Sequence, residues 1–275
     1  MNPVRDLSRP TPPPLPSPPQ HRSNSRLTPP PLFPLRDDNP TTLTPVVTVV
    51  LILANVAVWV YVQGMGQSTQ VLAQTVCALG TIPGEVTGLS GGYGGVDLGD
   101  DLPACFIGGL RYETLVTSMF LHGSWVHLIT NMWFLWLFGN NIEDAVGHVR
   151  FVVFYLLTGL AAVAGHVFAD PSSLVPVVGA SGAISGVMGA YLLLYPRIRI
   201  QTLFIFVIIL RIIPVPAWLV LLPWFALQVL TGYMDPVGSS GVAVWAHVGG
   251  FLAGVLLIKL FEDRTLTAAR RQRVS

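Results

Sequence analysis

The chain has 275 residues, of which 52% are hydrophobic and 11% are charged, and its formal net charge is +1. Soluble domains carry about 25% charged residues. The composition therefore excludes an ordinary soluble domain and predicts a polytopic protein of the lipid bilayer. The small net charge gives no reason to expect nucleic acid or a strongly acidic partner.

The first 44 residues are rich in proline, serine and arginine and contain no apolar core, so no secretory signal peptide is expected there. Such a composition cannot bury a hydrophobic core, and it predicts a disordered, partly polyproline tail over 1–44. A basic C-terminal tail is expected over 263–275. The membrane domain is expected over 45–262.

Six apolar segments approach the length that a bilayer requires: 45–63, 124–139, 149–169, 180–195, 214–232 and 242–261. The apolar piece 203–213 is too short to span alone, and Pro214 and Pro216 interrupt its continuation. It is expected to be an interfacial connection, because each proline removes a donor and bends the path. The predicted fold class is an all-α integral membrane bundle of six transmembrane helices.

Basic residues indicate the orientation of these spans. If the N-terminal tail lies inside, then its five arginines, Arg150, the arginines of 196–211 and the arginines of the C-terminal tail are all inside. Arg111 alone then lies outside. Both termini are therefore expected in the cytoplasm.

The first outer loop, about 64–112, is longer than ordinary connections. It contains both cysteines of the chain, Cys77 and Cys105. In an oxidising compartment a disulfide is plausible. The spacing does not show that the two residues approach each other, so two unpaired thiols remain an equal alternative.

A run of small residues over 177–186 leads into the fourth span, with glycine and alanine on both sides of Ser181. The Ser181 hydroxyl is uncrowded at the positive end of a helix, where free N–H groups could hold an oxyanion. Gly182 and Gly186, four residues apart, are equally typical of tight packing between membrane helices. On this stretch alone, packing is the favoured interpretation.

Three other polar residues are expected at the same depth, because spans two, four and six all begin on the outer side. His127 and Asn131 lie near the start of span two, and His247 lies near the start of span six. Polar groups inside a membrane are costly and are satisfied by one another or by a wet cavity. A serine with a histidine supplies a nucleophile and its base, while His127 and Asn131, spaced i and i+4, could stabilise an oxyanion. No carboxylate lies at this depth in the three helices, so a dyad is expected.

Metal binding is the rival use of histidines. None of the six histidines belongs to an H-E-x-x-H pattern, and no carboxylate accompanies the inner pair. We therefore expect neither a metal nor another cofactor.

Taken together, these motifs resemble the rhomboid family of intramembrane serine proteases over about Arg111 to Gly254. The matching pieces are Arg111, HGSWVHLITN at 122–131, Glu143 with Gly147, GASG at 179–182, and AHVGG at 246–250 continuing to Gly254. Each piece is weak alone. All of them in this order, on these spans, form a specific signal.

The resemblance implies that Ser181 is the nucleophile and His247 its base. Oxyanion stabilisation is implied for His127, Asn131, the Ser181 backbone and Gly179. Structural or packing roles are implied for His122, Gly182, Gly250, Gly254, Arg111 and Glu143; for Glu143 the alternative is a plain solvated turn.

The substrates implied by the resemblance are single-span membrane proteins whose transmembrane segment unwinds near the outer face. The compact six-span form is typical of a bacterial inner membrane protein, with the active site toward the outer side. Two further hypotheses are a rhomboid-like protein that binds membrane segments without cutting them, and a transporter or channel. Against the last, no inverted repeat is visible and the polar groups gather toward one face.

Two positions depart from the family pattern. Leu110 stands where many members have a tryptophan before Arg111. Ser185 stands where many members have an aromatic ring that stacks on the catalytic histidine. Another group therefore has to orient His247.

Overall fold

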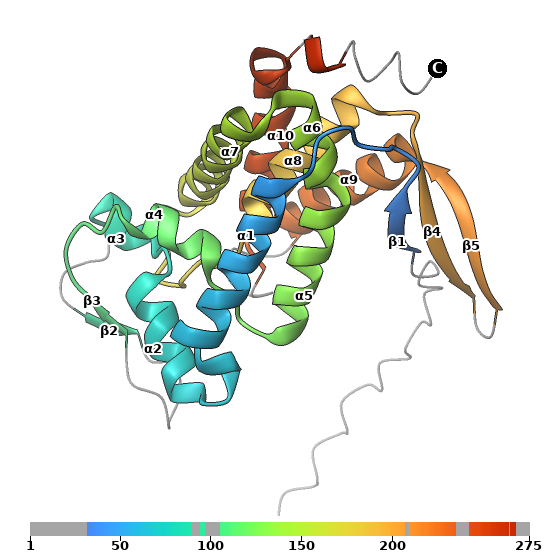
Figure 1. Ribbon diagram of the computed structural model, residues 1–275. Coiled ribbons are helices and arrows are strands. Elements are labelled where there is room, and N and C mark those ends of the chain that lie inside the picture. Colours follow the sequence, from blue (N-terminus) through green and yellow to red (C-terminus); the bar gives the residue numbers. More distant parts are fainter. Residues whose placement is uncertain are drawn as a thin grey trace, which may run out of the picture.

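The computed structural model describes residues 32–89, 94–96, 105–206, 209–234, 242–263 and 265–267. Its main body is a helical bundle, with a small sheet along one flank and a loop domain at one end (Figure 1). Of the predicted tails over 1–44 and 263–275, residues 1–31, 264 and 268–275 lie outside the described residues. We call the end at which α5, α8 and α10 begin the outer end, and the opposite end the inner end.

Three helices in the described part of the chain are long and apolar enough to cross a membrane: α7 (His148–Ala169), α9 (Ala217–Met234) and α10 (Val244–Phe261). The predicted first span is α1 (Val46–Ala57) continued by the π-helical η1 (Val58–Val62). The second is α5 (Trp125–Phe134), η4 (Leu135–Gly139) and α6 (Asn140–Val146), and the fourth is α8 (Ser181–Leu194). The protein is thus a mostly helical membrane protein, and the count of six spans stays a prediction.

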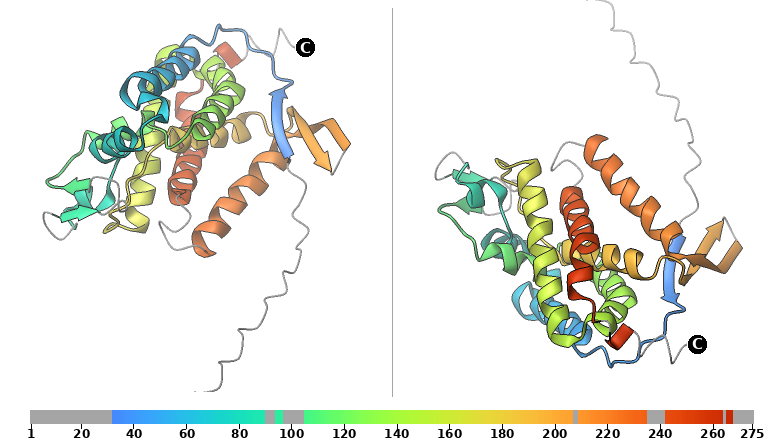
Figure 2. Two further views of the ribbon diagram at one scale, coloured as in Figure 1. Left: turned by 90° about the horizontal axis from the view of Figure 1, so that it is seen from below. Right: turned by 90° about the horizontal axis from the view of Figure 1, so that it is seen from above.

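Helix α8 occupies the centre of the bundle, and its residues from Gly182 to Tyr191 are all buried. Helices α7 and α10 lie side by side next to it (Figure 2). A side-chain carbon added at Gly165 of α7 would lie 3.2 Å from the Gly249 Cα of α10, so these two backbones are in direct contact. Small residues therefore set the spacing of the three central helices.

The segment after α8 corrects the all-α prediction. Residues predicted as an interfacial connection form a hairpin, β4 (Arg199–Phe206) and β5 (Ile209–Pro216), and β1 (Leu32–Asp37) completes an antiparallel sheet in the order β1-β4-β5. The hairpin is rich in β-branched and aromatic residues, which favour strands. Pro214 and Pro216 lie in an edge strand, where a missing N–H donor is tolerated.

The segment before α1 also differs from the prediction, since residues 32–44 are ordered rather than part of a disordered tail. Besides β1, this segment is held by side chains of the inner end. The Tyr191 hydroxyl and the Asn141 amide both donate to Asp37 Oδ2, at 2.6 and 2.8 Å. Asp144 Oδ1 accepts from the Thr42 and Leu43 N–H groups at 2.9 and 2.6 Å. Composition alone did not indicate these long-range partners.

The outer loop contains regular structure. Its described residues include η2 (Gly64–Gly66), α2 (Thr69–Leu79), α3 (Pro83–Thr87), β2 (Gly94–Val96) and β3 (Cys105–Ile107), and α4 (Thr114–Thr117) and η3 (Ser118–Phe120) follow before α5. Thr81 exchanges two backbone hydrogen bonds with Val177, at 3.0 and 2.7 Å. The loop is thereby tied to the strand-like segment that leads directly into α8.

Candidate active site

Ser181 is the first residue of α8, directly after the buried Ala180. The first N–H groups of a helix have no partner within it and lie at its positive end. Gly182 and Ala183 follow, and both are buried. The Ser181 hydroxyl therefore lies beside backbone donors at the outer end of the central helix α8.

His247 comes from the first turn of α10 and faces Ser181. Its Nε2 lies 2.8 Å from Ser181 Oγ, and its Nδ1 lies 2.8 Å from Gln228 Oε1 of α9. Serine and histidine are thus in hydrogen-bond contact, as a nucleophile and its base require. The two residues that the sequence placed at one depth meet from separate helices.

Close packing of glycines brings α10 to α8. A side-chain carbon at Gly250 would overlap the carbonyl oxygen of Gly182, and one at Gly254 would overlap that of Gly186. On its other face, Gly182 lies against Ala162 of α7. The predicted packing glycines therefore lie at helix contacts that only residues without side chains allow.

His127 lines the same cavity as Ser181 and His247 and lies in the first turn of α5. Ser124 caps this helix by accepting from the His127 N–H at 3.1 Å. The Gly123 N–H donates to His127 Nδ1 at 3.3 Å. Because Nδ1 accepts a hydrogen bond, the proton of the neutral ring is on Nε2. That N–H is free to donate to a developing negative charge.

Gly179 has a different role from the predicted one. Its N–H donates to the Ser118 carbonyl at 2.9 Å, so it is not available to an oxyanion. Its φ is +125°, and an added side-chain carbon would lie 2.8 Å from His127 Nε2 and 3.6 Å from Ser181 Oγ. The absence of a side chain leaves room for His127 to approach the serine.

Asn131 lies one turn after His127 and is 6% exposed. Among the described residues its Nδ2 has no hydrogen-bond partner. His127, Asn131, Ser181 and His247 all line a cavity of about 400 Å³, together with Ser185, Trp224 and other residues. A buried amide donor without a partner, beside a nucleophile, can serve a charge that forms during reaction.

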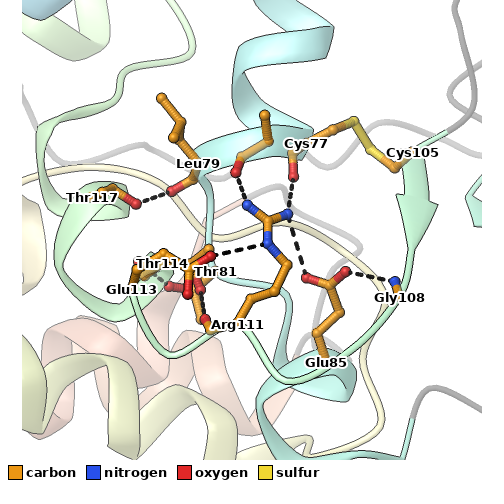
Figure 3. Close-up of polar contacts among 11 residues, drawn as sticks. Cys77, Leu79, Thr81, Glu85, Cys105, Gly108, Arg111, Glu113, Thr114 and Thr117 are labelled. Atoms are coloured by element: carbon orange, nitrogen blue, oxygen red, sulfur yellow. Dashed lines mark hydrogen bonds and ion pairs between the residues drawn. A yellow bond between two sulfur atoms is a disulfide. The ribbon is translucent and has the colours of Figure 1, made fainter.

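The loop at the outer end is anchored by Arg111 although Leu110 precedes it (Figure 3). Its guanidinium donates to the carbonyls of Cys77 and Ala78, and Glu85 lies 3.9 Å away as an ion-pair partner. Cys77 and Cys105 form a disulfide with a Cα–Cα separation of 5.3 Å. Of the two alternatives for the cysteines, the structure has the disulfide.

The other two residues with implied structural roles are buried. Glu143 accepts from the Val47 and Thr48 N–H groups, each at 2.8 Å, and so caps α1, whose own N-cap is Pro45. The alternative of a solvated turn is wrong for this carboxylate, which is 0% exposed.

His122 exchanges two hydrogen bonds with the Gln63 amide through its backbone, and its ring packs edge-on against His127. Burial lowers the pKa of His122 to about 3, and His127 acts in the same direction against a backbone hydrogen bond with Phe120. The His122 ring is therefore neutral at ordinary pH.

Two residues at the site were missed by the sequence reasoning, Gln228 and Trp224 of α9. The Trp224 ring lies with its centroid 5.9 Å from that of His247. Gln228 could have been found from the sequence as a glutamine within an apolar spanning helix, because polar groups there are costly and usually functional.

The rhomboid domain family model matches residues 110–263, which is more than half of the chain and contains every residue of the cavity. The chain belongs to the rhomboid family. This confirms the resemblance seen in the sequence.

Rhomboid relatives come from several kinds of organism. Rhomboid protein 1, mitochondrial, of Saccharomyces cerevisiae is 34% identical over 152 residues, which are 52% of this chain and 40% of the yeast protein. RHOMBOID-like protein 6, mitochondrial, of Arabidopsis thaliana is 33% identical over 147 residues, 52% of this chain and 41% of its own length. YdcA of Bacillus subtilis, a candidate rhomboid protease by name, is 29% identical over 156 residues, 54% of this chain and 69% of its own length. The chain thus matches less than half the length of the yeast and plant relatives.

Proposed function

We propose that the protein is an intramembrane serine endopeptidase that cuts transmembrane segments of single-span membrane proteins through Ser181 and His247. The observation that carries the proposal is the 2.8 Å contact between Ser181 Oγ and His247 Nε2, within a cavity that His127 and Asn131 also line. Family membership supports a protease, since YdcA is a candidate protease by name.

In the proposed reaction, His247 Nε2 takes the Ser181 proton as the hydroxyl oxygen attacks the substrate carbonyl. The negative charge of the tetrahedral intermediate is held by the His127 Nε2–H, the Asn131 amide and the Ser181 N–H. The imidazolium of His247 then donates its proton to the leaving amine. Water, deprotonated by the same imidazole, hydrolyses the acyl-enzyme.

The substrate has to be unwound at the cut. An α-helix with side chains is about 10–12 Å in diameter and shields its own peptide bonds. A cavity of about 400 Å³ accepts a short extended stretch rather than a whole helix. A transmembrane segment that frays at the outer end of the bundle meets this requirement.

We further propose that both termini are cytoplasmic and that the cavity opens toward the outer side of a bacterial plasma membrane. The distribution of arginines supports this orientation. The disulfide in the outer loop supports an oxidising compartment on that side. Two of the relatives are named as mitochondrial, so the family also occurs in organelle membranes.

The test is cleavage of a model single-span substrate in proteoliposomes by wild type, Ser181→Ala and His247→Ala. We expect cleavage by wild type and loss in both variants, with substrate binding retained. Equal cleavage by wild type and Ser181→Ala refutes the assignment. Binding by all three without cleavage favours the rhomboid-like binding protein instead.

A further inference from the structure

The turn of α8 that follows Ser181 does not provide the group that orients His247. Ser185, one turn after the nucleophile, carries no ring, and its hydroxyl donates to the Ser181 carbonyl at 2.7 Å. Serine hydroxyls in helices commonly make this backward bond. The side chain at 185 is therefore engaged within its own helix.

Gln228 of α9 contacts the other side of the imidazole. Its Oε1 lies 2.8 Å from His247 Nδ1, while Nε2 lies 2.8 Å from Ser181 Oγ. A neutral imidazole has one donor and one acceptor nitrogen. If Nε2 accepts the serine proton, Nδ1 carries a hydrogen and needs an acceptor, which the amide oxygen supplies.

We propose that Gln228 is the positioning residue of the catalytic base: its amide oxygen holds His247 in the Nδ1–H tautomer and directs Nε2 at Ser181. This inference rests on the proposed protease function. Gln228 contacts His247 Nδ1, whereas Ser181 contacts Nε2 on the opposite side of the ring, so Gln228 acts through the imidazole. Its amide is neutral and leaves the cavity without a fixed negative charge.

The rest of the α9 surface supports this role. Trp224, one turn before Gln228, places its ring 5.9 Å from the imidazole at an angle of 38°. Phe225 stacks on Phe251 of α10 with ring centroids 4.4 Å apart. One face of α9 thus provides an acceptor and an aromatic wall for the base, and a stacked pair that docks the helix.

The position of Gln228 links base alignment to the docking of α9. In the apolar stretch of each spanning helix, 11% of α9 is buried, against 39% of α10 and 44% of α7. Pro223, five residues before Gln228, lies inside the helix and removes one of its backbone hydrogen bonds. Figure 2 shows α9 at the margin of the bundle, oblique to α10. An outward displacement of α9 would remove Gln228 from His247, so the base is aligned only while α9 is docked.

Three variants test the inference. Gln228→Met keeps the length of the side chain and removes the acceptor, while Gln228→Glu keeps an acceptor and adds a charge. Leu227→Met is the matched control, because Leu227 is the adjacent residue of α9 and is 56% exposed. The measurements are kcat, KM and the pH profile on a single-span substrate, the labelling rate of Ser181 by a fluorophosphonate, and the thermal unfolding temperature.

We expect Gln228→Met to lower kcat and the labelling rate by about 10- to 100-fold, because a buried donor loses its acceptor. KM should stay within about twofold of wild type, since substrate binding is untouched. Gln228→Glu should restore most of the rate and move the acidic limb of the pH profile to higher pH, because a carboxylate favours the imidazolium. Leu227→Met should behave as wild type.

A Gln228→Met variant with wild-type kcat and labelling rate would overturn the inference. A lowered unfolding temperature of Gln228→Met that Gln228→Glu does not restore would also overturn it, because the role of Gln228 would then be structural. If wild type neither cleaves nor reacts with the fluorophosphonate, the proposed function itself fails, which is a separate result from either of these.

Discussion

At the inner end of the bundle the buried polar groups include carboxylates, whereas those that line the outer cavity are imidazoles, an amide and hydroxyls. Glu143 and Asp144 accept hydrogen bonds from the backbone around the start of α1, and Asp37 accepts from Tyr191. The outer cavity is lined by His127, Asn131 and His247 among others, and no carboxylate is among its lining residues in the described chain.

The difference between the two ends follows from whether a polar group serves a permanent or a transient partner. A fixed carboxylate suits a permanent partner such as a helix N-terminus, which is positive in every state of the protein. A site that stabilises a negative charge only during reaction gains from neutral donors. The carboxylates of the inner end therefore suit permanent partners, and the neutral donors of the outer cavity suit the transient charge of the proposed reaction.

The most severe way to break this contrast is to put a carboxylate into the outer cavity. Asn131→Asp removes an amide donor and places a negative charge where the oxyanion forms. We expect kcat/KM to fall by about 1000-fold or more, with Asn131→Ala falling by about 100-fold. Both variants should fold, as judged by unfolding temperature. An Asn131→Ala protein that fails to fold would assign this residue to structure.

The next largest effect is expected from removing a carboxylate at the inner end. Glu143→Ala leaves the N–H groups of the half-buried Val47 and the buried Thr48 without an acceptor. We expect a loss of about 3–4 kcal/mol in the free energy of unfolding, measured in detergent. Glu113→Gln is the control, because Glu113 is 62% exposed in its pair with Arg111. It should change stability by less than about 1 kcal/mol, and an equal loss in both variants would contradict the comparison.

The outer end has a covalent restraint that the inner end lacks. The disulfide joins residues 28 apart, and such a link typically contributes about 2–3 kcal/mol by restricting the unfolded chain. A reducing agent should lower the unfolding temperature of wild type and have no effect on Cys77→Ser. Equal unfolding temperatures with and without reductant would show that the restraint contributes nothing.

The smallest effect concerns the neutral histidine beneath the site. Burial holds the pKa of His122 at about 3, below the ordinary value of 6.5. Between pH 6.5 and pH 3, His122 binds a proton in the unfolded chain but not in the folded chain. The contribution of the neutral ring to the free energy of unfolding is therefore full above pH 6.5 and is lost as the pH falls toward 3.

Between pH 7.5 and 5.5 the loss attributable to His122 should be about 1 kcal/mol. His122→Gln should show a flatter pH dependence of the unfolding temperature than wild type. Parallel curves for the two proteins would show that His122 does not control this dependence.

The sequence was sufficient to predict residues that meet through helix periodicity and membrane depth. Ser181 and His247 lie in apolar spans that begin at the same end, which predicts a common depth, and the rhomboid resemblance implied the contact between them that the structure has. The role of Gly179 was not predictable, because its N–H partner, Ser118, belongs to a distant loop segment. Gln228 was missed because its role depends on the rotation of α9 relative to α10, which hydrophobicity does not determine.

The same limit explains the errors in the fold. Pro214 and Pro216 were interpreted as interruptions of a helix, yet both residues are compatible with the edge of a sheet. The order of residues 32–44 depends on Asp37 and Asp144, whose partners come from the neighbouring chain segment and from α6 and α8. Composition describes the segment but not what it touches.

The prolines of β5 also protect the molecule from unwanted associations. The unpaired margin of an open sheet is a template to which any extended chain can add. The residues at 214 and 216 have no N–H to donate, and β1 on the opposite margin contains Pro34 and an irregular register next to it. Each margin therefore offers fewer donors to a further strand, which opposes edge-to-edge association between copies of the protein.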